Sequence, residues 1–140
     1  MNQLYSGARQ RFLTKYIDWN AENEIAFTLL NDAYVFDESH IAYAVIPPEA
    51  IAARSVALDR YSTEGWAQTP VVVFSGVQSD KPITSIVISR AMNVGDPESN
   101  HELLVFYDQV HQLPYTPPPV GGDFWLVYDQ LFDPGGWFRL

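Results

Sequence analysis

The chain has 140 residues, of which 47% are hydrophobic, and it contains no cysteine. This length suits one domain with a sizeable core, the composition is too apolar for a disordered chain, and no disulfide or thiolate–metal scaffold can hold the fold. The formal net charge of −9 argues against a nucleic-acid partner, because recognition of nucleic acids depends on lysine and arginine neutralising phosphates. No apolar run approaches the roughly 20 residues that cross a bilayer, so no membrane partner is expected.

The first segment of the chain predicts a short helix. Apolar residues recur in it at helical spacing, at Leu4, Ala8, Phe12 and Tyr16. We therefore expect residues 1–16 to form a helical arm. Three basic residues lie in this arm before the first acidic residue of the chain, namely Arg9, Arg11 and Lys15. A basic arm on an acidic body suits docking to an acidic protein surface, and a solvated helix face explains the pattern equally well.

Short runs of β-branched, aliphatic and aromatic residues predict strands along the rest of the chain. They cover residues 24–30, 51–58, 71–74, 83–92, 103–107 and 124–128. The alanines within 51–58 would also suit a helix. Pro47 and Pro48 close the segment 41–46, which we expect to be an edge strand or an extended arm. The sequence thus predicts an all-β fold: a single β-sandwich domain over residues 1–140, jelly-roll or Ig-like, with a short N-terminal helix.

The last residues of the sequence are mostly apolar, with Trp137 and Phe138 followed by Arg139 and Leu140. Exposed termini are normally polar and frayed, so we expect this segment to lie in a sheet or against a partner. The sequence also has 4 tryptophans, 8 tyrosines and 8 phenylalanines, which would suit a carbohydrate-binding surface. Most aromatic residues of a sandwich lie in its core, and an interface role suits one or two of them.

The sequence assembles no convincing catalytic or metal-binding set. Histidine occurs at His40, His101 and His111, and a metal site built from His101, His111 and Asp129 is conceivable. Its spacing matches none of the common zinc motifs, so we expect these histidines to be solvated loop residues. The sequence also lacks a nucleophile elbow and a glycine-rich phosphate loop. We therefore predict no enzymatic activity, no cofactor and no resident metal.

Two groups of short segments carry a family resemblance. In the first half they are Ile17-Asp18-Trp19, Ile25-Ala26-Phe27-Thr28-Leu29, Tyr34-Val35-Phe36 and His40. In the second half they are Leu113-Pro114-Tyr115-Thr116-Pro117, Gly121-Gly122-Asp123 and Phe138-Arg139-Leu140. In this order they resemble the small structural proteins of tailed-bacteriophage virions. The chain departs from that pattern where Pro118-Pro119-Val120 lengthens a loop and where Asp123-Phe124-Trp125 replaces a β-branched run.

The resemblance implies a β-rich virion component without enzymatic activity, present in many copies. Our leading expectation is a capsid decoration or cement protein that bridges major capsid subunits and forms a homo-oligomer. A head–tail connector or a tail- or fibre-associated protein is the second virion hypothesis. In each case the expected partners are the phage major capsid protein or other virion subunits, and the expected location is the virion, assembled in the host cytoplasm. A glycan- or host-surface-binding module is the alternative from another class.

We expect the partner interface to use the basic arm, the proline-containing segments and the aromatic end. Prolines pre-order an extended segment and so lower the entropy lost on docking. The candidate interface residues are Arg9, Arg11, Lys15, Pro47, Pro48, Tyr115, Pro117, Pro118, Trp137 and Phe138.

Overall fold

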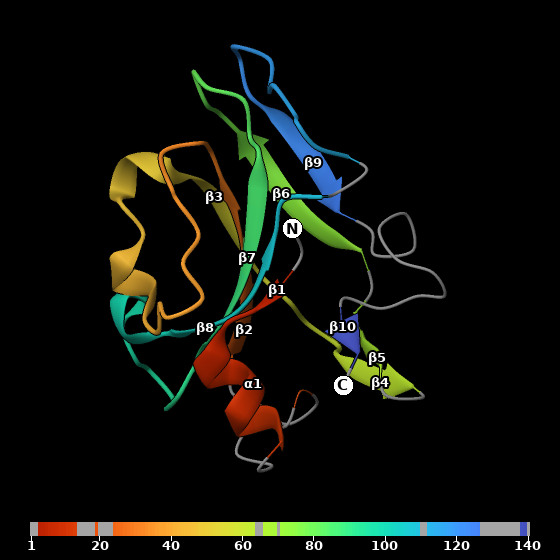
Figure 1. The fold of residues 1–140 in the computed structure, drawn as a ribbon. Helices are drawn as coiled ribbons and strands as arrows, with labels where there is room; N and C mark the ends of the chain where they lie inside the picture. The colour runs from red at the N-terminus through yellow and green to blue at the C-terminus, as the bar shows by residue number, and fades with distance from the viewer. Residues whose placement is uncertain are drawn as a thin grey trace.

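The computed structural model describes residues 3–13, 19, 24–63, 66–69, 71–109, 112–126 and 138–139. Its elements are β1 (Gln3–Leu4), α1 (Ser6–Leu13), β2 (Glu24–Leu30), β3 (Ile51–Val56), β4 (Tyr61–Thr63), β5 (Trp66–Gln68), β6 (Val72–Val77), β7 (Ser85–Ala91), β8 (Glu102–Tyr107), β9 (Gly122–Leu126) and β10 (Phe138–Arg139), with 3-10 turns η1 (Tyr43–Val45), η2 (Pro48–Ala50) and η3 (Glu98–Asn100). The predicted all-β fold with a short N-terminal helix is confirmed (Figure 1). The jelly-roll or Ig-like sandwich type stays a prediction.

The described strands form three antiparallel sheets. The largest has the strand order β1-β8-β7-β2-β3, and two smaller sheets have the orders β10-β5-β4 and β6-β9. Figure 1 shows the β6–β9 pair above the three short strands β4, β5 and β10, with α1 below the large sheet. The large sheet is therefore the body on which the helix and the loops are placed.

The central strands of the large sheet are buried on both faces. Every residue of β7 and β8 is buried. A strand covered on both faces needs a continuous apolar run instead of an alternating one, and the segments 25–30 and 103–107 have such runs. Residues of one strand alternate between the faces. Even-numbered residues of β2 share a face with η1, where the hydroxyl of Thr28 lies 3.3 Å from that of Tyr43.

A β-bulge between β7 and β8 decides which residue of β8 lies opposite Arg90. The register shifts between Ile88 and Ser89, so that Leu103 pairs with Ser89 and Glu102 pairs with Arg90. Without the extra residue, Leu103 would lie opposite Arg90. Bulges redirect side chains in this way, and this one brings a carboxylate beside a buried guanidinium.

The large sheet meets the β6–β9 sheet along a seam between β3 and β6. The Ser55 hydroxyl of β3 donates to the Val73 carbonyl of β6 at 2.8 Å, while the two strands belong to different sheets. Left-handed backbone occurs at Gly76, inside β6 at the bulge in its pairing with β9, with φ of +59°, and at Gly121, just before β9, with φ of +85°. A side chain at Gly121 would also meet the Gln78 side chain at 3.2 Å, so glycine is required there.

The strand predictions hold for the larger elements, since β2, β3, β6, β7, β8 and β9 all lie at the expected places. The segment 41–46 was wrongly predicted as an edge strand or extended arm. Tyr43–Val45 forms a 3-10 turn instead, and only Ala42 makes an isolated bridge, to Glu102. The Tyr43 side chain is buried and its amide donates to the His101 carbonyl at 2.8 Å, so tertiary contacts bend this segment.

The expectation that the apolar segment 137–140 lies in a sheet holds for its described residues, 138 and 139. Phe138 and Arg139 form β10, which pairs with Ala67 and Trp66 of β5. The sequence did not predict the short strands β1, β4 and β5. The helix is described over Ser6–Leu13. The predicted helical arm of residues 1–16 was wrong at Gln3–Leu4, which pair with β8 as the strand β1, and residues 1–2 and 14–16 lie outside the described residues.

Phe27 offers a test of this core, because it is fully buried at the centre of β2. We expect Phe27→Ala to lower the free energy of unfolding by about 3–5 kcal/mol, through lost transfer energy and the cavity that remains. Urea unfolding followed by circular dichroism measures this change. Val94→Ala is the control, since Val94 is 86% exposed and its truncation should change little. A loss at Phe27 as small as that at Val94 would contradict the described core.

Candidate functional site

A buried carboxylate shared by two arginines lies on the face of the large sheet covered by α1. Glu102 is 2% exposed and Arg90 is 6% exposed. The Nε and Nη2 atoms of Arg90 both lie 2.8 Å from Oε2 of Glu102. Arg11 of α1 donates to the other oxygen, Oε1. Each oxygen of the buried carboxylate therefore binds an arginine, and the three side chains join α1, β7 and β8.

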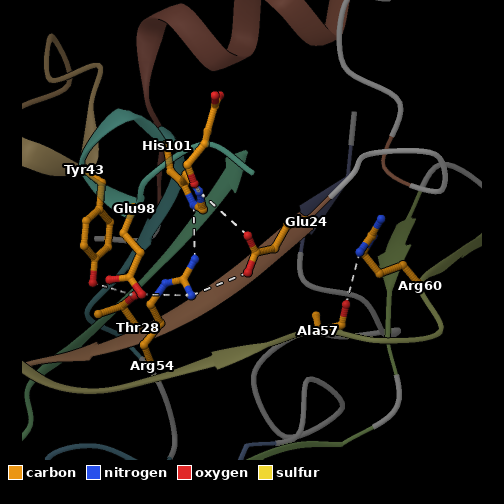
Figure 2. A network of polar contacts seen from close by, with 9 residues as sticks. Glu24, Thr28, Tyr43, Arg54, Ala57, Arg60, Glu98 and His101 are labelled. Carbon is orange, nitrogen blue, oxygen red and sulfur yellow. Dashed lines mark hydrogen bonds and ion pairs between the residues drawn. The ribbon is translucent and has the colours of Figure 1, made fainter. Parts of the chain in front are cut away.

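A second polar cluster lies on the opposite face, around Arg54 of β3 (Figure 2). Its guanidinium nitrogens lie 3.6 Å from Glu24, 3.4 Å from Glu98 and 3.1 Å from Nδ1 of His101. Arg54 thereby ties β3 to β2 and to the turn η3. Tyr43 and Thr28 meet beside this cluster, as Figure 2 shows.

The hydrogen bonds of His101 define which of its nitrogens carries the proton. Arginine can only donate, so Nδ1 of His101 accepts from Arg54. The Nε2 atom lies 3.2 Å from the Asp96 carbonyl, which can only accept, so Nε2 carries the proton. The ring is thus neutral and both nitrogens are engaged. His101 is also 1% exposed, and its two hydrogen bonds hold the η3 turn against β3.

The prediction that the histidines are solvated loop residues is wrong for His101, which is buried. His111 and Asp129, the other members of the conceivable metal site, lie outside the described residues. Within the part of the chain that the structure describes, no group of three or more histidines, cysteines or acids could hold a metal ion. No helix among the described residues is long and apolar enough to cross a membrane.

Tyrosine hydroxyls form a third polar group beneath the loop that follows β2. The hydroxyls of Tyr5 and Tyr34 lie 2.7 Å apart, and the Tyr34 hydroxyl lies 3.0 Å from Nδ1 of His40. Burial raises the pKa of Tyr5 and of Tyr34 above the ordinary value of tyrosine. Burial raises the pKa of Tyr43 and of Tyr107 as well. All four rings are therefore held neutral as parts of the fold.

The predicted interface residues occupy several different elements. Arg9 lies exposed on α1, whereas Arg11 is occupied by Glu102 of the same chain. Pro48 and Pro118 are exposed, and Pro47 is half-buried.

The other predicted interface residues are less accessible or lie outside the description. Pro117 is buried, and Tyr115 is half-buried, with its ring 4.8 Å from that of Phe124 and its backbone paired with Ile83. The backbone of Phe138 lies in β10. Lys15 and Trp137 lie outside the described residues.

An exposed apolar surface, which we call the β6 patch, was not among the predicted residues. It consists of Val56, Leu58, Val71, Val73 and Trp125, each at least 37% exposed. Val73 and Trp125 are cross-strand partners on β6 and β9, and a groove of about 280 Å³ runs beside them between residues 55–59 on one side and residues 69 and 71–73 on the other. Exposed apolar patches on folded domains mark contact sites for other proteins. The alternation of exposed and buried residues in β6 appears only in the folded chain, because residues 71–74 are all apolar in the sequence and do not indicate which face is exposed.

Comparisons with known proteins found no family model, no curated protein and no solved structure that matches this chain.

The two ion clusters differ in burial, which gives a matched pair of variants. We expect Glu102→Gln to lower the free energy of unfolding by about 3 kcal/mol, because it leaves the buried Arg90 without a counter-charge. Glu98→Gln makes the same chemical change at a side chain that is 60% exposed, and should cost about 0.5 kcal/mol. Urea unfolding of both variants measures the difference. Equal losses would mean that the Arg90–Glu102 pair is not buried as described.

The buried tyrosines predict a loss of stability in alkali. Unfolded tyrosines ionise above about pH 10, whereas Tyr5, Tyr34, Tyr43 and Tyr107 resist ionisation in the folded chain because their pKa values are raised. These four groups should therefore leave the free energy of unfolding unchanged below about pH 10 and lower it as the pH rises further. Urea unfolding across this range measures the slope. In Tyr5→Phe the slope should be smaller, and an unchanged slope would exclude Tyr5 as a contributor.

Proposed function

We propose that this chain is a non-enzymatic structural protein of a bacteriophage virion, which decorates the capsid by binding major capsid subunits. The observation that carries the proposal is the likeness of its segments to small tailed-phage virion proteins, above all Leu113–Pro117 and Gly121–Asp123. These segments serve the fold here. Tyr115 pairs with Ile83, the Gly121 amide donates to the Pro118 carbonyl, and the Gly76 amide donates to Asp123.

The β6 patch supports a role in protein contacts. Interfaces place aromatic and aliphatic side chains at their centre, and Trp125 on β9 is 60% exposed beside Val73. Tryptophan is among the residues that contribute most to binding when a partner covers them. We therefore place the capsid contact of the proposed decoration protein on this patch.

Four arginines bond to groups of their own chain. Arg11, Arg54 and Arg90 bind carboxylates of the same chain, and Arg60 donates to the backbone carbonyls of Trp19 and Ala57. Their role is to hold the domain together. Substitution of Arg9 can therefore probe docking of the basic arm while the ion pair between Arg11 and Glu102 stays intact.

Purified virions of the phage that encodes the chain provide the test. We expect the protein to be present in a number of copies comparable to that of the major capsid subunit, as measured by quantitative peptide mass spectrometry. About a dozen copies or fewer would point to the connector or tail alternative. Absence from virions, together with saturable binding to a glycan array, would replace the proposal by the surface-binding alternative.

The same preparation tests the contact surface. We expect Trp125→Ser to fold normally but to bind capsids about thirtyfold more weakly, because removal of a central interface tryptophan costs about 2 kcal/mol. Binding to capsids that lack the protein, measured by sedimentation, gives the affinity. Val94→Ser changes another exposed apolar side chain, at 86% exposure in the turn between β7 and β8, and should bind normally. Equal affinities of the two variants would remove the β6 patch from the contact.

A further inference from the structure

A second concave surface, which we call the aromatic groove, lies away from the β6 patch. It has a volume of about 470 Å³ and is lined by Asp32, Tyr34, Val35, Phe36, Thr84, Ser85, Phe106 and Asp108. The loop after β2 supplies one wall, and β8 with the start of β7 supplies the other. Val35 is 77% exposed at its edge. None of these residues takes part in either ion cluster.

The aromatic walls of the groove are preformed. The rings of Phe36 and Phe106 stack with centroids 4.7 Å apart, and the ring of Tyr34 lies 6.0 Å from that of Phe106. Tyr34 is anchored by its hydroxyl, which contacts both Tyr5 and His40. A site whose walls are already fixed loses little conformational entropy when a ligand enters.

The charges at the rim are negative, with one exposed cation beside them. Asp32 and Asp108 are the acidic residues among those that line the groove. The Lys81 ammonium lies 3.6 Å from Asp32, and the two side chains are 55% and 74% exposed. An exposed pair of this kind is worth little and is readily exchanged for another cation. The formal charge of the whole chain, −9, adds to the attraction for a cation.

We propose that the aromatic groove binds an arginine side chain presented by a basic segment of a partner protein. A guanidinium is planar and permanently charged, stacks on aromatic rings and pairs with carboxylates, so it matches the half-buried ring of Phe36 and the exposed carboxylate of Asp32. The rings of Tyr34 and Phe106 are each 6% exposed and support the Phe36 ring from within. A lysine ammonium would find the carboxylates but would gain less from the rings. This site goes beyond the proposed function and does not depend on the partner being a capsid subunit.

The first test uses the whole protein, labelled with ¹⁵N, and the peptide acetyl-Gly-Arg-Gly-amide as the probe. We expect saturable chemical-shift changes confined to the amides of residues 32–36, 84–85 and 106–108. The peptide with citrulline in place of arginine has the same shape without the charge, and should bind at least about tenfold more weakly. Equal binding of the two peptides, or shift changes centred elsewhere, would overturn the proposal.

The second test exploits the cation that already occupies the rim. We expect Lys81→Ala to bind the arginine peptide about twofold more tightly, because it removes the competitor for Asp32, and Asp32→Asn to bind about threefold more weakly. Arg9→Ala is the matched control, since it also removes one exposed positive charge but lies on α1. The affinity of this control should not change. If Arg9→Ala and Lys81→Ala had equal effects, the attraction would be due to net charge and the groove site would be rejected. Unchanged binding of the arginine peptide by Asp32→Asn would reject the groove site as well.

Discussion

The rest of the structure depends on keeping the Glu102 carboxylate paired within the sheet. A buried charge without a partner costs several kcal/mol, so Arg90 and Arg11 must both reach it. This requirement fixes the β7–β8 register through the bulge and fixes α1 against β8 through its last turn. The described part of the helix has eight residues, a length that is not stable alone in water, so its position is set by this contact and by its buried residues Ala8 and Phe12.

Arginines that bond within the chain reduce the positive charge that the domain surface offers. The sequence has 8 lysines and arginines against 17 acids, and Arg11, Arg54, Arg60 and Arg90 all bond to groups of their own chain. The positive charge available to a partner is therefore smaller than the composition suggests, while the formal net charge of the chain stays at −9. Such a surface repels other acidic proteins and favours partners that present basic segments.

The sequence predicted the parts of the fold that depend on local patterns, and failed where distant residues decide. The largely apolar runs at 25–30 and 103–107 form strands that are buried in the large sheet. Two- and three-residue strands such as β1 and β4 have no pattern of their own. His101 looked like a turn residue because its partner Arg54 is 47 positions away. The β6 patch was missed for a similar reason, since Val73 and Trp125 become neighbours only through the β6–β9 pairing.

The seam between β3 and β6 has a mechanical consequence. Strands within a sheet separate only when several backbone hydrogen bonds break together, as between β2 and β3. At the seam, one hydroxyl hydrogen bond from Ser55 and the packing of neighbouring side chains hold the two sheets. Apolar packing resists sliding less than a ladder resists shear, because it has no fixed direction. The β6–β9 sheet can therefore tilt at this seam more easily than the strands within the large sheet can slide past one another.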